Sequence, residues 1–319
     1  MQTVLVAGGA GFIGSHLCKN LLSDNFKVIC IDNFITGDKN NLKDQLQDQD
    51  FKLIETDIAE KLPQSLFAEK IDYIFDLASP ASPNKKSPRS FINHPIETLR
   101  ANSFGVYNLL NLAKEKSAKL LYVSSSEIYG DPLISSQKED YFGNVNPNGI
   151  RSVYDEGKRF GEAVTMAYFR KFDLDIRIIR IFNTYGPNMQ VDDGRIISNF
   201  INQAIANKPL TVYGSGKQTR SFCYVSDMVE GLKNAMFSQK SKGEVFNLGN
   251  PKEMEVLEMA NLIKKMTKSS SEIIFEELPE DDPKRRNPDI SKAKSVLGWE
   301  PKITVEEGLE KTIEYFRSL

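Results

Sequence analysis

The first 183 residues alternate between short apolar runs and amphipathic stretches. Each apolar run is bounded by glycine, proline or polar residues, which predicts a buried strand. These runs are Thr3–Ala7, Lys27–Ile31, Phe51–Glu55, Tyr73–Leu77, Lys119–Val123 and Asp175–Ile181. Helical spacing follows Gly14 through about Ser23 and also extends over Ile96–Lys116 and Tyr154–Arg170. This order predicts a doubly wound α/β fold with a parallel sheet covered on both faces.

The pattern changes after Pro187. Helices are predicted at Ile196–Ala206, Ser226–Ser238, Val256–Thr267, Ser291–Leu297 and Val305–Arg317, and short strands at Leu210–Tyr213 and Val245–Leu248. We therefore expect one domain over residues 1–183 and a smaller α/β substrate-binding lobe over 184–319. Segments around 225–250 are expected to return to the first domain.

Composition narrows the class of protein. The chain of 319 residues is 40% hydrophobic and 26% charged, with a net charge of −2, so no basic field points to nucleic acid or to an acidic membrane. Its three cysteines are scattered, which argues against a disulfide framework or a zinc site and for a reducing compartment. No signal peptide or membrane-spanning run is apparent, so we expect a cytoplasmic protein. We also expect no bound metal.

A glycine-rich turn joins the first predicted strand to the first helix. Gly8, Gly11 and Gly14 are spaced as Gly-x-x-Gly-x-x-Gly, and the second strand ends at Asp32. This arrangement is the dinucleotide-binding unit of a Rossmann fold, in which the helix N-terminus faces a pyrophosphate. An acid at Asp32 can bind ribose hydroxyls and would repel a 2′-phosphate, so NAD is favoured over NADP.

Polar residues follow several other strands. Asp57 could meet an adenine amino group or could simply cap a turn. The serines Ser124–Ser126 and Glu127 follow another strand, where they are placed for chemistry or form an ordinary serine-rich turn. In an open α/β sheet, ligands bind at these carboxyl ends.

Tyr154 and Lys158 share one face of a predicted helix because they are four residues apart. A neighbouring ammonium favours the phenolate, so such a pair can move a proton on or off a hydroxyl. Taken alone, this spacing also occurs by chance.

Together these motifs resemble the extended short-chain dehydrogenases/reductases that modify nucleotide sugars, and the resemblance extends from Val4 to Leu319. The stretch from Arg180 to Pro187 belongs to the same pattern. Within that superfamily, several stretches are similar to UDP-glucuronate decarboxylases: Ile31–Gly37, Leu77–Pro83, Ser125–Glu127, Tyr154–Lys158, Asp193–Arg195 and Asp282–Arg286.

The resemblance implies roles for four catalytic residues. Tyr154 would take the proton from the sugar 4-hydroxyl, and Lys158 would bind the nicotinamide ribose and lower the pKa of the tyrosine. Ser125 would hydrogen-bond O4, and Glu127 would lie near C5 and the carboxylate.

The resemblance also implies two sets of binding residues. The NAD cofactor would contact the turn glycines together with Phe12, Ile13, Asp32, Asn33, Asp57, Ile58, Leu77, Ser79, Tyr154, Lys158 and Thr184. The UDP part of the substrate would contact Asn183, Arg195, Tyr213, Gln218, Arg220 and Arg286, and Arg100 is a further candidate for substrate binding. A homodimer is implied, formed through the helices Ile96–Lys116 and Tyr154–Arg170.

The implied reaction is NAD-dependent conversion of UDP-glucuronate to UDP-xylose through a 4-keto sugar. A 4,6-dehydratase of the dTDP-glucose type ranks second because Ser126 stands where such enzymes have an aspartate. A 4-epimerase ranks third, and a non-catalytic NAD-binding sensor is the rival from another class of protein. Two departures from the decarboxylase pattern are Ser125, where threonine is usual, and a longer loop, Asn84–His94, whose Lys85, Lys86 and Arg89 would lie near the sugar.

Overall fold

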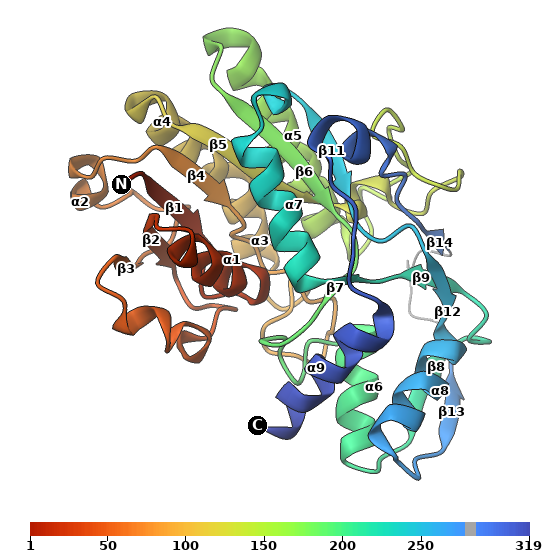
Figure 1. The fold of residues 1–319 in the computed structure, drawn as a ribbon. Coiled ribbons are helices and arrows are strands. Elements are labelled where there is room, and N and C mark those ends of the chain that lie inside the picture. The colour runs from red at the N-terminus through yellow and green to blue at the C-terminus, as the bar shows by residue number, and fades with distance from the viewer. Residues whose placement is uncertain (278–284) are drawn as a thin grey trace.

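The computed structural model describes residues 1–277 and 285–319, so residues 282–284 of the Asp282–Arg286 stretch lie outside the described part. A parallel sheet of seven strands, in the order β11-β6-β5-β4-β1-β2-β3, forms the centre of the described chain (Figure 1). Its strands are β1 (Thr3–Ala7), β2 (Lys27–Asp32), β3 (Phe51–Glu55), β4 (Tyr73–Asp76), β5 (Lys119–Ser125), β6 (Ile176–Ile181) and β11 (Val245–Leu248). The predicted α/β fold class is confirmed.

Helices cover both faces of the sheet. Alternate residues of a strand point to opposite faces, so the apolar side chains of each strand must be buried on both sides. Val4 and Val6 of β1 pack in one apolar cluster with α1 (Phe12–Ser23) and α7 (Val225–Phe237). Leu5 and Ala7 pack in a second cluster with α4 (Val106–Lys116) and α5 (Ser152–Phe172). Both faces of β1 are therefore buried, which explains its uninterrupted apolar sequence.

The predicted helix Ile96–Lys116 is interrupted. It consists of α3 (Pro95–Arg100), a π-helical turn η3 (Ala101–Gly105) and α4. Asn102 lies in this turn, where its amide donates to the carbonyl of Thr98 at 2.9 Å and to the hydroxyl of Ser79 at 2.8 Å. A side chain at Gly105 would lie 2.5 Å from Cδ1 of Ile58, so the turn brings the helix against the Rossmann core.

The second lobe is built from elements that lie past the carboxyl ends of the main strands (Figure 1). Two of its helices, α6 (Ile196–Ile205) and α8 (Val256–Thr267), pack against each other beside the pair β8 (Leu210–Tyr213) and β13 (Ile273–Glu276). The other strands are β7 (Thr184–Tyr185), β9 (Thr219–Ser221), β10 (Cys223–Tyr224), β12 (Glu253–Glu255) and β14 (Arg285–Arg286). Strand β9 lies between β12 and β14.

The remaining helical segments are short, apart from α9. They are α2 (Gln64–Ala68), α9 (Val305–Arg317), the 3₁₀ turns η1 (Lys39–Leu42), η2 (Gln45–Gln47), η4 (Ser126–Tyr129) and η5 (Gln239–Ser241), and the π turn η6 (Ala293–Leu297). The segment predicted as the helix Ser291–Leu297 is thus largely a π turn. Within the described ranges, no helix is long and apolar enough to cross a bilayer, and no cluster of candidate metal ligands occurs.

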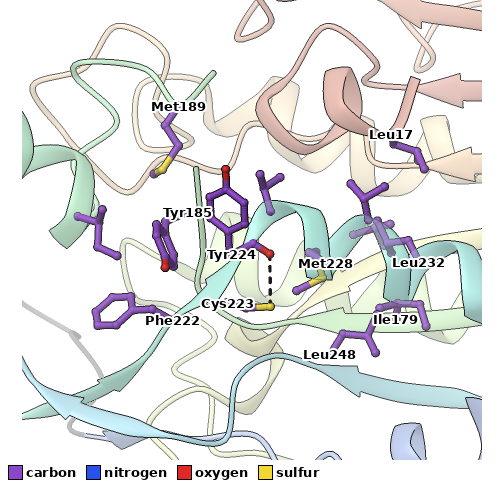
Figure 2. Close-up of a cluster of buried hydrophobic side chains, with 14 of the residues drawn as sticks. Leu17, Ile179, Tyr185, Met189, Phe222, Cys223, Tyr224, Met228, Leu232 and Leu248 are labelled. Atoms are coloured by element: carbon purple, nitrogen blue, oxygen red, sulfur yellow. Dashed lines mark hydrogen bonds between the residues drawn. The ribbon is translucent and has the colours of Figure 1, made fainter. Parts of the chain in front are cut away.

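One apolar core joins the sheet to the second lobe. Figure 2 shows Tyr185 and Tyr224 in one cluster with Met228 and Leu232 of α7 and with Leu248, the last residue of the sheet strand β11. The rings of Tyr185 and Tyr224 meet edge to face with centroids 5.6 Å apart. All three cysteines, Cys18, Cys30 and Cys223, are buried and free.

Candidate active site

Two adjoining cavities open at the carboxyl ends of the sheet strands. The Tyr154 cavity is lined by Tyr154, Lys158, Ser125 and Glu127, and the neighbouring Asp32 cavity by Asp32 and residues of the turns after β2, β3 and β4. Because both are lined by Gly8, Gly11, Thr36, Leu77 and Ser79, they form one continuous cleft. The strand ends thus bring together side chains that lie far apart in the sequence.

The glycine turn has no room for side chains. A Cβ at Gly14 would overlap the carbonyl oxygen of Gly8, and Gly8 itself has φ +75° with Ala78 only 2.9 Å from a notional Cβ. Gly11 caps the N-terminus of α1, whose partial positive charge faces the cleft. The turn is therefore shaped for the close approach of an anionic group.

Asp32 holds the turn as well as lining the cleft. Its carboxylate accepts hydrogen bonds from the backbone N–H groups of Ala10 and Phe34, each at 2.9 Å. Burial raises the pKa of Asp32, and these hydrogen bonds act against that rise. Asp57 binds the side chain of Asn33 at 3.1 Å and also caps its own turn through the N–H of Ala59 at 2.8 Å.

All of the residues predicted to contact the cofactor line the cleft. Phe12, Ile13, Gly14 and Thr184 lie in the Tyr154 cavity. Asn33, Asp57 and Ile58 lie with Asp32 in the other cavity, and the remaining predicted residues are shared or belong to the catalytic group.

The catalytic group is assembled by β5 and α5. Tyr154 and Lys158 lie in the first turns of α5 and are almost fully buried. The Lys158 ammonium donates to the carbonyl of Val123 at 2.9 Å and lies 5.8 Å from the centroid of the Tyr154 ring. Ser125, the last residue of β5, hydrogen-bonds the Tyr154 hydroxyl.

The expected lowering of the Tyr154 pKa by Lys158 is not what this arrangement produces. Burial raises the pKa of Tyr154 to about 12, while the hydrogen bond from Ser125 and the charge of Arg195 act in the opposite direction. Burial also lowers the pKa of Lys158 to about 8, against the attraction of Asp76 and Glu162. Desolvation of the buried phenol thus outweighs the effects of Ser125 and Arg195 on its pKa.

Glu127 is held between two arginines. Arg286, on β14 of the second lobe, donates from Nη1 to Glu127 Oε1 at 2.8 Å and to the Ser126 hydroxyl at 3.0 Å. Arg151, which immediately precedes α5, binds the other carboxylate oxygen. Burial alone would raise the pKa of Glu127, but the charges of both arginines outweigh burial and hold it well below its usual range. Glu127 is therefore ionised at neutral pH.

Asp155 adjoins this group. It is buried, its Oδ1 makes no hydrogen bond to any described residue, and burial together with the charge of Glu127 raises its pKa.

The long loop after β4 reaches the catalytic group. Phe91 stacks on the ring of Tyr154 with centroids 5.1 Å apart and planes inclined by 15°. Arg89 lines the Tyr154 cavity and lies 3.8 Å from the carboxylate of Asp38, whereas Lys85 and Lys86 are exposed and outside the lining. Of the cations predicted to lie near the sugar, only Arg89 therefore reaches the cavity.

The candidate substrate residues are placed unevenly. Asn183 and Arg195 line the Tyr154 cavity. Tyr213, Gln218 and Arg220 lie in the second lobe outside that lining, with the Gln218 amide bonded to the Tyr213 carbonyl at 2.6 Å. Arg286 binds Glu127 and also lies outside the lining.

The structure does not bring Arg100 to either cavity. Arg100 instead pairs with Glu60 at 2.5 Å on the surface of α3. Sequence reasoning missed Arg151 and Phe91, both of which line the Tyr154 cavity. Arg151, three positions before Tyr154, had a detectable signal because residues three apart adjoin at a helix start. Phe91 lies in an irregular loop and had none.

Comparison with known proteins identifies the family. The sequence profile of the family described as GDP-mannose 4,6 dehydratase matches residues 5–312. The chain is 49% identical over 316 residues to UDP-glucuronic acid decarboxylase 1 of Xenopus tropicalis, covering 99% of this chain and 72% of that protein. It is 50% identical over 315 residues to UDP-glucuronic acid decarboxylase 6 of Arabidopsis thaliana, covering 98% and 88%. The chain belongs to the nucleotide-sugar-modifying extended short-chain dehydrogenases/reductases.

Solved structures of other extended short-chain dehydrogenases/reductases have the same fold. UDP-glucuronic acid 4-epimerase from Bacillus cereus, solved with UDP-glucuronic acid and NAD, superposes with a TM-score of 0.89 at 29% identity, covering 99% of each chain. UDP-glucose 4-epimerase from Thermotoga maritima, solved with UDP-glucose, gives 0.89 at 27% identity with the same coverage. The resemblance inferred from the sequence motifs is thereby confirmed.

Proposed function

We propose that this dehydrogenase/reductase is an NAD-dependent UDP-glucuronate decarboxylase that forms UDP-xylose. The observation that carries the proposal is the Tyr154 cavity, which brings Ser125, Tyr154 and Lys158 together with an ionised Glu127. Identity near 50% over almost the whole chain to proteins named UDP-glucuronic acid decarboxylase supports the same reaction.

The cleft fits NAD. Its glycine turn admits a pyrophosphate, the N-terminus of α1 faces that position, and Asp32 lines the part of the cleft where an adenosine ribose would lie. When bound, NAD would accept a hydride from C4 of the sugar and later return it. We expect NADP to bind at least about tenfold more weakly than NAD in a calorimetric titration, because Asp32 would repel a 2′-phosphate.

The chain's own residues would perform the proton transfers. In its phenolate form, Tyr154 would take the O4 proton as C4 is oxidised, and Ser125 and Arg195 favour that form against the effect of burial. The C4 ketone is then β to the C5 carboxylate. The C5–carboxylate bond breaks, carbon dioxide leaves, and the bonding electrons form an enolate across C4 and C5. A proton from water then adds at C5, and C4 regains its hydride while Tyr154 returns the proton to O4, which completes UDP-xylose.

Glu127 would hold positively charged side chains in place near the carboxylate end of the sugar. An ionised carboxylate accepts protons or hydrogen bonds but cannot supply a proton, so Glu127 is not the acid for C5 at neutral pH. Its two arginines are held in fixed directions by the carboxylate oxygens. We infer that Glu127 positions Arg151 at the wall of the cavity, where a guanidinium can meet an anionic group of the substrate.

The rival functions make different products. For a 4,6-dehydratase, position 126 would need an acid, and the Ser126 hydroxyl is already bound by Arg286 at 3.0 Å. A 4-epimerase is favoured by the two solved neighbours, one of which carries UDP-glucuronic acid. An NAD-binding sensor would have no use for the assembled Ser125, Tyr154 and Lys158.

One incubation separates these functions. The purified protein is mixed with NAD and UDP-glucuronate, and carbon dioxide and nucleotide sugars are measured. We expect one carbon dioxide per UDP-xylose, or per 4-keto pentose if the product leaves early. UDP-galacturonate without carbon dioxide would show an epimerase, and turnover of dTDP-glucose to a 4-keto-6-deoxy sugar would show a dehydratase. NAD binding without turnover of any of these would favour the sensor.

We also infer that a second copy of this chain covers the outer face of α3, α4 and α5. Large apolar side chains are exposed there and include Ile96, Leu99, Phe104, Tyr107 and Phe160. Tyr107 and Phe160 belong to neighbouring helices and their ring centroids are 6.2 Å apart, and Ile96, Leu99 and Phe104 precede Tyr107 on the same continuous run of helix. We call these five residues the apolar patch. Contiguous exposed apolar surface of this kind marks an interaction site.

A further inference from the structure

Phe91, in the loop after β4, contacts the side chains of two residues at the start of α5. One face of its ring stacks on Tyr154, and the Arg151 guanidinium carbon lies 5.8 Å from the same ring's centroid. Phe91 is only 1% exposed, so these contacts are shielded from water. Stacked aromatic pairs and cation–π contacts are both attractive, so each favours one rotamer of the side chains involved.

The contacts close into a ring of five residues. The Arg151 guanidinium binds the carboxylate of Glu127. The backbone N–H of Glu127 donates to the Ser125 hydroxyl at 3.2 Å. Ser125 in turn hydrogen-bonds Tyr154. The first turn of α5 already joins the backbones of the two residues, since the Tyr154 N–H donates to the Arg151 carbonyl at 3.0 Å, and Phe91 adds the direct link between their side chains.

The position of Phe91 depends on the second lobe. Its N–H donates to the Ser82 carbonyl at 3.0 Å, and the Ser82 hydroxyl donates to the carbonyl of Asp193 at 2.5 Å. The Ser87 hydroxyl binds the carboxylate of Asp192 at 2.8 Å. The loop is thereby fastened to the segment that carries Arg195, another residue of the cavity wall.

We propose that Phe91 is a positioning residue that fixes the Tyr154 phenol and the Arg151 guanidinium relative to each other. This role rests on the proposed decarboxylase function, because it links the group that moves the O4 proton to the groups at the carboxylate end. Phe91 also excludes water from one face of the phenol, which contributes to the burial that raises the pKa of Tyr154.

The test replaces Phe91 by leucine, which stays apolar but has no ring face. We expect Phe91→Leu to lower kcat about 10- to 100-fold, because small misplacement of reacting groups is costly. KM for UDP-glucuronate should rise by a smaller factor than kcat falls, because Arg151 keeps its bond to Glu127 while Tyr154 loses its stacking partner. The matched control is Lys86→Ala in the same loop, an exposed residue outside the cavity lining, which should leave both constants unchanged.

A second measurement does not depend on turnover. Fluorotyrosine is placed at position 154, and its titration is followed by fluorine NMR in the wild-type and Phe91→Leu backgrounds. We expect the midpoint to lie above that of free fluorotyrosine and to fall toward it in Phe91→Leu. If the titration shifts as expected but the wild-type protein does not turn over UDP-glucuronate, the positioning role stands and the decarboxylase function is refuted.

Two outcomes would overturn the role of Phe91. The first is an unchanged titration of residue 154 together with an unchanged kcat in Phe91→Leu. The second is a lower kcat with no change in the titration, which indicates a general structural defect. If Phe91→Leu does not fold, Ser87→Ala replaces it, because removing the bond to Asp192 loosens the loop while Phe91 is kept. The same shift in titration, smaller in size, is expected, and its absence would refute the role.

Discussion

Arg286 and Glu127 are separated by 159 positions in the chain, yet Arg286 Nη1 lies 2.8 Å from Glu127 Oε1. The arginine belongs to β14 of the second lobe and the glutamate to the turn after β5. The same guanidinium donates to the Gly130 carbonyl at 3.0 Å, so it fastens the whole turn. The ion pair therefore joins the two lobes at the wall of the Tyr154 cavity, and its loss should affect both stability and catalysis.

We expect Arg286→Met to lower the free energy of unfolding by about 2–3 kcal/mol. Removing one partner of a buried ion pair is strongly destabilising, and Glu127 moderates the loss because it keeps Arg151 and some exposure to water. Urea denaturation measures this change. The double variant Glu127→Gln, Arg286→Met should lose less than Arg286→Met alone, and an equal or larger loss would contradict the pairing.

Tyr154→Phe should lower kcat by about 10²- to 10⁴-fold, because it removes the hydroxyl that moves the O4 proton. The free energy of unfolding should change little, since the ring and its stacking on Phe91 are retained. Steady-state turnover of UDP-glucuronate measures the effect. Tyr168→Phe is the matched control because its hydroxyl binds Asn111 at the surface. Full activity in Tyr154→Phe would refute the assigned base.

Asp155 gives the stability a pH dependence whose sign follows from its pKa. Burial and the charge of Glu127 raise that pKa in the folded state, while Arg151 and Arg286 act in the opposite direction. Above about pH 4 the folded state therefore keeps a proton that the unfolded state has lost, and this group's contribution to stability falls as pH rises.

The side chain at position 155 in Asp155→Asn cannot lose a proton, so its contribution to the free energy of unfolding does not fall as pH rises. Relative to wild type, the variant should gain stability between about pH 5 and about pH 8, by about 1.4 kcal/mol for each unit of pKa shift titrated in that window. Urea denaturation at both pH values gives the difference. A stability difference that does not change with pH would show that Asp155 has an ordinary pKa.

Phe104→Glu should convert the expected dimer to monomers. Phe104 is 58% exposed within the apolar patch, and a charge there would have to be buried between the two copies. Sedimentation velocity gives the mass of the particle. Leu133→Glu is the control because Leu133 is 80% exposed but lies outside α3, α4 and α5. A wild-type protein that sediments as a monomer would exclude this interface.

The regular elements could be predicted because their signals are local. The bounds of β1, β3, β8, β11, α8 and α9 agree with the apolar runs and helical spacing of the sequence. The glycine turn was also recognisable, since the glycines and the helix start lie within a few residues of one another. Two- and three-residue strands such as β9 and β14 were missed because they are too short to show a period.

The site was only partly predictable. Strand ends carry Ser125, Glu127 and Asp32 to the cleft, and the parallel order of the sheet makes that placement a consequence of the sequence pattern. Arg100 looked equally suited to an anionic substrate, but the direction of its helix face pairs it with Glu60 instead. Charge along the chain does not reveal which side of a helix meets the cavity.

The sequence by itself determined the dinucleotide turn, the parallel sheet and the Tyr154–Lys158 pair, because each depends on spacing within one or two elements. Only the tertiary structure decided that Arg286 binds Glu127, that Phe91 stacks on Tyr154, and that Tyr154 is buried deeply enough for its pKa to rise. These relationships depend on which distant surfaces meet and how much water they exclude. No local pattern of residue types specifies either quantity.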